Sequence, residues 1–134
     1  MTKKEVETLD IASLLGAVQE PQLQVLSIFI PNKDKNNKVI DNHKKWVKEA
    51  IDILSSIGGG ATAMPPADGS WLNSETGNMI LEKTTVIYSY VYPDKFKENM
   101  QNLRNFLHKF GRESNQGEVV FEWDNQFFKI RKYD

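Results

Sequence analysis

The stretch MILEKTTVIYSYVYPDKF, residues 79–96, decides the fold of this chain. Its part up to residue 92 is dense in β-branched and aromatic side chains, which predicts one long strand. Pro93 and Asp94 follow at once, and both residue types are typical of the first turn of a helix. A long strand that runs directly into a helix indicates an α+β domain, in which helices pack on an antiparallel sheet.

The segments before this stretch predict a strand, a helix and a shorter strand. LQVLSIFI (23–30) has apolar residues on both faces, which is typical of a central strand. A helix with one broad apolar face is expected to begin near Asp41, a good N-cap residue, and to stop at Gly58. The shorter strand is expected near 61–64 or 69–72.

The remaining segments predict two turns and the rest of the sheet. NSETGN (73–78) resembles a hairpin turn, since it holds a glycine able to take a positive φ. The helix that opens at residue 93 keeps its apolar spacing as far as Gly111, where we expect it to end. A last hairpin is expected over 118–131, turning at Asp124 and Asn125.

The order of these elements is that of the split βαβ, or ferredoxin-like, fold. It predicts one antiparallel sheet with two helices on one face and an extra C-terminal strand. The opposite face of the sheet is left for something else to cover. Residues 1–20 form a loose helical pattern and are expected to be an N-terminal arm or helix, and residues 21–134 a single domain.

Composition excludes several classes of protein. The chain has 134 residues, no cysteine and a net charge of −1. Cysteine nucleophiles, thiolate metal sites and disulfides are thereby excluded, and nucleic acid is not an expected partner. His43 and His108 have no metal-ligand spacing, so neither a metal nor a cofactor is expected. No apolar run reaches the length of a membrane span, about 18 residues, and no secretory signal is visible, so we expect a cytoplasmic protein with no membrane partner.

The predicted topology brings GRESNQGE (111–118) to one end of the sheet. Arg112, Glu113, Asn115 and Gln116 offer a cation, a carboxylate and two amides, which together could orient a small polar or anionic ligand. The alternative is a solvated connection between a helix and a strand, in which Asn and Gly are common.

A candidate catalytic residue, Glu82, starts the long strand at the same end of the sheet. A carboxylate among apolar neighbours can have a raised pKa and act as an acid or a base. The alternative is an ion pair, for which Arg112 is the expected partner.

The segment SSIGGGATAMPPADGSW (55–71) raises the question of a ligand loop. It is not a phosphate loop, because it follows a helix and lacks the Lys-Ser/Thr pair that contacts phosphate. Its glycines are expected to stop a helix, and the alternative is a loop whose backbone amides line a ligand. Trp71, which ends the segment, is a candidate ligand-binding residue.

Tyr88, Tyr90 and Tyr92 are expected on the face of the sheet that the helices do not cover. They favour a homodimer or a higher homo-oligomer, since tyrosine suits subunit interfaces. The alternative is stacking on nucleic-acid bases.

The pattern GGGATAMPPADGSW, followed by Gly77 and Glu82, resembles a family of small bacterial proteins to which no activity is assigned. GRESNQGEVVFEW is similar to a downstream part of the same proteins. The order of elements also resembles the trimeric PII-like signalling proteins, which bind nucleotides at a loop before their last strand. This second likeness is one of fold, and the basic residues expected around a phosphate are missing.

Three functions are compatible with the sequence. The first is a cytosolic binding or regulatory module that self-associates through its sheet. The second is a small enzyme that uses Glu82 as acid or base, with Arg112 and Gln116 holding the substrate. The third is a nucleotide sensor of the PII-like kind. Whether the chain is an enzyme stays open at this point.

Overall fold

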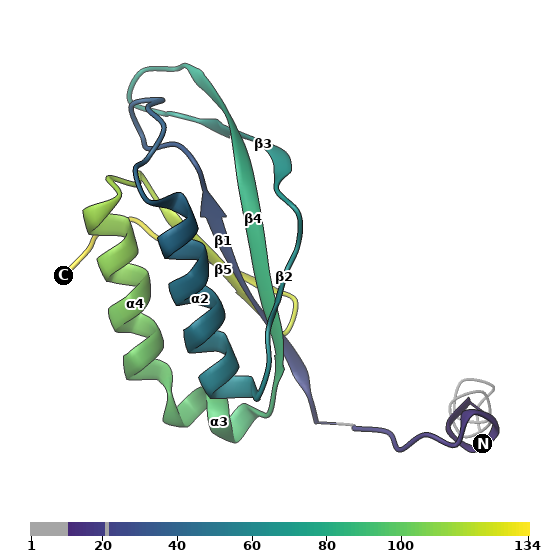
Figure 1. Cartoon of the computed structure of the whole chain (residues 1–134). Helices are drawn as coiled ribbons and strands as arrows, with labels where there is room; N and C mark the ends of the chain where they lie inside the picture. The colour runs from purple at the N-terminus through teal and green to yellow at the C-terminus, as the bar shows by residue number, and fades with distance from the viewer. Residues whose placement is uncertain (1–10, 21) are drawn as a thin grey trace.

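The computed structural model describes residues 11–20 and 22–134. Within them, helices α2, α3 and α4 pack on one face of a six-stranded sheet (Figure 1). The elements are β1 Gln24–Pro31, α2 His43–Gly58, β2 Thr62–Ala63, β3 Ala67–Leu72, β4 Met79–Val91, α3 Pro93–Glu98, α4 Met100–Glu113, β5 Val119–Trp123 and β6 Gln126–Ile130.

The sheet has the order β2–β4–β1–β5–β6, and β3 also pairs with β4. Every pair is antiparallel, with Ile28 of β1 opposite Ile87 of β4 at the centre. Strands β2 and β3 together take the place of the second strand of a split βαβ unit, and β6 is the extra C-terminal strand. The predicted α+β, ferredoxin-like fold with two helical segments on one face is confirmed.

The core lies between the sheet and the helices. Leu26, Ile28 and Ile30 alternate along β1 and are fully buried on the helical side. Trp46 of α2 is buried against the rings of Phe106 and Phe110 of α4, at centroid distances of 6.3 and 5.2 Å. The pleat of β1 and β4 therefore assigns one face to the core. The other, here called the open face, has no covering layer among residues 11–20 and 22–134.

Helix α2 differs from its predicted bounds at both ends. Asp41 is not its N-cap: Asn42 has that place, with a left-handed φ of 62°, and the helix begins at His43. Gly58 is the last helical residue, and Gly59 takes the positive φ of 85° that ends the helix. A Cβ on Gly58 would lie 2.2 Å from Ser89 Oγ, so this glycine lets the helix approach β4 closely.

The second predicted helix is two helices, α3 and α4, separated at Asn99. Helix α4 also continues past Gly111 to Glu113. Gly111 does not end it, because its missing side chain makes room for Tyr133, whose ring atoms lie 2.2–2.7 Å from where a Cβ would be.

The predicted hairpins are confirmed. Both short segments after α2 are strands, and the turn at 73–78 joins β3 to β4, with Gly77 at φ 75°. Asp124 and Asn125 have φ values of 52° and 64° between β5 and β6, as a two-residue hairpin turn of the primed type requires.

The N-terminal segment is described from residue 11 onward. Residues 11–15 are helical, and the apolar side chains of this segment are exposed: Ile11, Leu14, Leu15 and Val18. Glu20 accepts a hydrogen bond from the Tyr92 hydroxyl at 2.6 Å. The part of the predicted arm before residue 11 lies outside the described residues, and the boundary at residue 20 stays a prediction. No helix in the described part of the chain is long and apolar enough to cross a membrane.

Candidate functional site

A pocket of about 490 Å³ lies on the open face of the sheet. Strands β1, β3 and β4 provide its floor, and the loops at 31–35 and 116–118 provide its rim. Apolar side chains such as Phe29 and Val86 line it beside the carboxylate of Glu82 and the ammonium of Lys33. A pocket that combines apolar side chains with converging charged groups is a candidate small-molecule site.

Glu82 points from β4 into this pocket and is half-buried. Burial raises the pKa of its carboxyl group, and the nearby positive charge of Lys33 opposes the change. Among residues 11–20 and 22–134, no hydrogen-bond donor satisfies this carboxylate. A carboxylate whose pKa is raised is a stronger base than an exposed one and can accept a proton from a bound ligand.

Gly69 lies directly opposite Glu82 in the pairing of β3 with β4. A Cβ at this position would be 3.7 Å from Glu82 Cγ and 3.1 Å from Thr84 Oγ1. The glycine therefore leaves the space beside the carboxylate free for a ligand.

Trp71 forms one wall of the pocket, next to Glu82 on the same face of the sheet. Its indole packs on Gly117, where a Cβ would lie 2.6 Å from Trp71 Cη2. The indole N–H donates a hydrogen bond of 3.1 Å to Glu118 Oε1. Glu118 also pairs with Lys129 at 3.3 Å and with Arg131 at 3.4 Å.

Gln116 lines the pocket as well, but its amide is used within the protein. Its side-chain Nε2 donates to the backbone carbonyl oxygen of Lys33 at 3.1 Å, and the backbone carbonyl oxygen of Gln116 accepts from the Tyr133 hydroxyl at 2.9 Å. These bonds fix the rim loop that follows α4 against the loop that follows β1. Gln116 therefore shapes the pocket in this structure.

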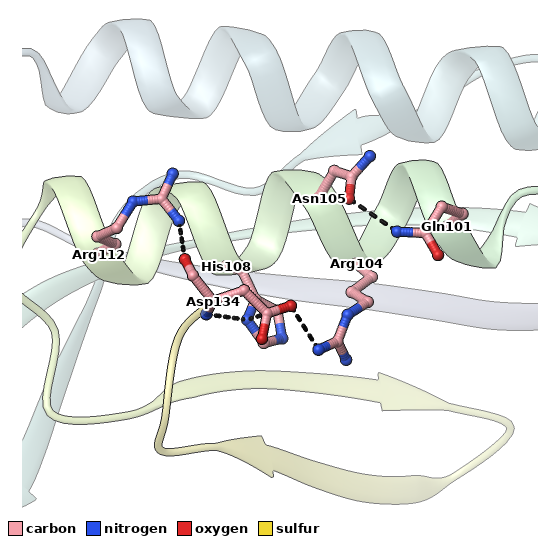
Figure 2. A network of polar contacts seen from close by, with 6 residues as sticks. All are labelled: Gln101, Arg104, Asn105, His108, Arg112 and Asp134. Atoms are coloured by element: carbon pink, nitrogen blue, oxygen red, sulfur yellow. Dashed lines mark hydrogen bonds and ion pairs between the residues drawn. The ribbon is translucent and has the colours of Figure 1, made fainter.

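Arg112 lies elsewhere. Figure 2 shows it on α4, where its guanidinium donates to the carbonyl oxygen of Asp134; it also pairs with Glu113 at 3.9 Å. The predicted ion pair between Glu82 and Arg112 is wrong: neither of these contacts involves Glu82, and Arg112 does not line the pocket. The reason is that α4 covers the helical side of the sheet, whereas Glu82 points to the open face.

Glu113 and Asn115 line a second hollow, which borders the start of α2 and Trp46. Asn115 has a left-handed φ of 55°, and its carbonyl oxygen accepts from the Lys35 N–H at 3.1 Å. The structure thus brings three of the six candidate residues together at one pocket and places the other three outside it. Those at the pocket are Trp71, Glu82 and Gln116, and those outside it are Arg112, Glu113 and Asn115.

The pocket is also lined by Lys33, Gly117, Glu118 and Lys129, which the sequence analysis did not name as site residues, although it singled out the segment 111–118 that contains two of them. Strand alternation held a signal for one of them, since Glu118 precedes β5 in step with Val120, which faces the pocket. For metals, no group of three acidic or histidine side chains in the described ranges could hold an ion.

Comparison with known proteins supplies a likeness of fold. No family model and no curated protein sequence matches the chain. A phage SAM lyase in complex with S-methyl-5'-thioadenosine superposes with a TM-score of 0.62 and 16% identity, over 83% of this chain and 91% of that one. A phage SAM lyase in the apo state superposes with a TM-score of 0.59 and 15% identity, over 86% and 94%. At such identities the likeness concerns the fold alone.

Proposed function

We propose that this protein is a lyase that binds SAM, S-adenosylmethionine, in the open-face pocket and releases S-methyl-5'-thioadenosine, with Glu82 as its acid–base group. The observation that carries the proposal is the half-buried Glu82 carboxylate, which faces the pocket with free space beside it. The shared fold with phage SAM lyase supports the choice of ligand.

The charges of the pocket suit a sulfonium ligand. A sulfonium carries one positive charge, which the Glu82 carboxylate attracts strongly in a partly desolvated site. Lys33 carries the opposite charge to Glu82, and its ammonium group can bind the carboxylate of the amino-acid arm. The volume of about 490 Å³ falls within the usual range for small-molecule pockets.

The reaction can be written with these groups and the substrate alone. Glu82 takes a proton from the Cβ of the amino-acid arm, next to the Cγ that is bonded to sulfur. The electrons of that C–H bond form a carbon–carbon double bond, the adjacent C–S bond breaks, and its electron pair goes to sulfur. The cationic sulfonium becomes a neutral thioether while the carboxylate becomes a neutral acid. This loss of charge on both partners is favoured in an apolar pocket, because burial disfavours each charged form.

The test is to incubate the protein with SAM and to quantify methylthioadenosine by chromatography. We expect release that is proportional to protein concentration, and a rise in melting temperature with methylthioadenosine but not with methionine. ATP belongs in the same melting panel, because a PII-like nucleotide sensor would respond to it. Ligand-induced stabilisation without turnover would leave a binding or regulatory module. Neither binding nor turnover would contradict the proposed function.

We also propose that the protein self-associates through its open face. Tyr90 is 57% exposed there, and its ring packs edge-on against Tyr88 at 6.1 Å. Phe127 of β6 is exposed on the same face at the border of the pocket. A sheet face with several exposed aromatic side chains is typical of a protein interface.

Sedimentation at micromolar concentration is expected to show a dimer or a larger assembly that Tyr90→Lys dissociates. The lysine places a charge within the proposed interface, where desolvation is costly. The matched control is Met100→Lys, because Met100 is 50% exposed at the start of α4, on the helical side of the sheet. A wild-type monomer at all concentrations, or equal effects of both variants, would exclude the open face as the interface.

A further inference from the structure

The contact of Trp71 with Gly117 and Glu118 joins two distant parts of the chain across the pocket. Trp71 belongs to β3, which among the strands that the structure describes pairs only with β4. Glu118 lies between α4 and β5, in the rim loop, 47 residues further along the chain. The hydrogen bond between them therefore closes the rim of the pocket from one edge of the sheet toward its centre.

Glu118 is held rigidly enough to orient a neighbour. Its side chain is only 13% exposed, and its two oxygens are shared among the indole N–H, Lys129 and Arg131. A carboxylate that accepts from several donors keeps one rotamer, because each alternative would leave a donor unsatisfied. The indole also packs directly on the backbone of Gly117, since it occupies the space that a Cβ would take there.

The geometry points to a purine platform: we propose that Trp71 stacks on the adenine ring of the ligand and that Glu118 is the positioning residue that fixes the indole. This inference rests on the proposed function and names the part of the ligand that Trp71 recognises. Trp71 and Glu82 are diagonal neighbours on β3 and β4, about 7–8 Å apart on such a sheet. In an adenosylsulfonium the ribose separates sulfur from the purine by a similar span. With sulfur beside Glu82, the purine therefore reaches the indole.

The decisive variants are Glu118→Leu and Glu118→Gln, with Glu122→Leu as the matched control. Leu removes the acceptor of the indole N–H, whereas Gln keeps one. Glu122 is a half-buried glutamate of the adjoining strand β5 that does not line the pocket. The readouts are the Kd of methylthioadenosine by calorimetry, and KM and kcat for SAM.

Glu118→Leu is expected to raise Kd and KM about tenfold or more, the scale of lost base stacking, with kcat at saturating SAM within about twofold. Glu118→Gln should recover most of the affinity, and Glu122→Leu should bind as the wild type does. A folded Glu118→Leu with wild-type Kd, or one with reduced kcat at unchanged KM, would overturn the inference while the proposed function survives.

Trp71→Leu decides the question if Glu118→Leu does not fold. It removes the platform without disturbing Lys129 and Arg131, and it is expected to weaken methylthioadenosine binding to a similar extent. A folded Trp71→Leu that binds methylthioadenosine as tightly as the wild type would overturn the stacking role. Failure of the wild type to bind methylthioadenosine or to cleave SAM would instead remove the proposed function, and this inference with it.

Discussion

Glu82→Gln is expected to slow the release of methylthioadenosine from SAM by about 10²- to 10⁴-fold, the usual contribution of a general base. Glutamine has the shape of glutamate and can still lie in the space beside Gly69, but it cannot accept a proton from carbon. The loss should therefore fall on kcat. The measurement is initial rates at saturating SAM, and Glu122→Gln on β5 serves as the control. Wild-type kcat in Glu82→Gln would show that another group takes the proton.

The stability of the same variant gives an independent check on the state of Glu82. Burial raises the pKa of this carboxyl group in the folded protein above its unfolded value. The folded state therefore binds the proton more tightly, and the contribution of Glu82 to stability is lost as pH rises through the folded pKa. In thermal unfolding between pH 4 and pH 8, the melting temperature of Glu82→Gln should accordingly rise relative to that of the wild type as pH rises. The opposite trend would mean that Glu82 is held by a cation instead of desolvated.

Much of the fold could be predicted because its signals are local. β-branched residues along β4, the proline at the start of α3 and the Asp-Asn turn before β6 each act within a few residues. The order of such segments leaves few arrangements of an antiparallel sheet. The bounds of the helices were harder to predict, because a glycine is also used where another segment packs closely. Gly58 makes room for β4 and Gly111 makes room for Tyr133.

Only those residues of the candidate site that lie on strands were predictable, because side chains alternate between the two faces of a strand. Glu82 was identified from its strand and Trp71 from the glycine-rich segment 55–71, and the pleat of the sheet places both on the open face. Arg112 was predicted at the wrong face of the sheet. The order of the elements determines at which end of the sheet Arg112 lies, but it does not determine whether its side chain lies on the helical side or on the open face. Contacts such as Trp71 with Glu118 join distant segments, and no local pattern reveals them.

Trp46→Ala is expected to lower the free energy of unfolding by about 3–5 kcal/mol, the range for removing a large aromatic side chain from a core. Trp46 is 5% exposed and fills the space between α2 and α4, where it packs on Phe106 and Phe110. Alanine would leave a cavity between these rings, because the two helices are fixed on the sheet by other buried residues. Urea unfolding at 25 °C measures the change.

The matched control for this core is Val47→Ala, because Val47 is the next residue of α2 and only partly buried. A smaller apolar side chain at the edge of the core should cost much less than Trp46, about 1 kcal/mol, because water and neighbouring side chains can fill the space. Trp46 also carries Lys45 and Lys109 near its ring, at 5.9 and 5.7 Å, so its removal frees two ammonium groups as well. Equal midpoints for Trp46→Ala and Val47→Ala would show that Trp46 does not join the two helices.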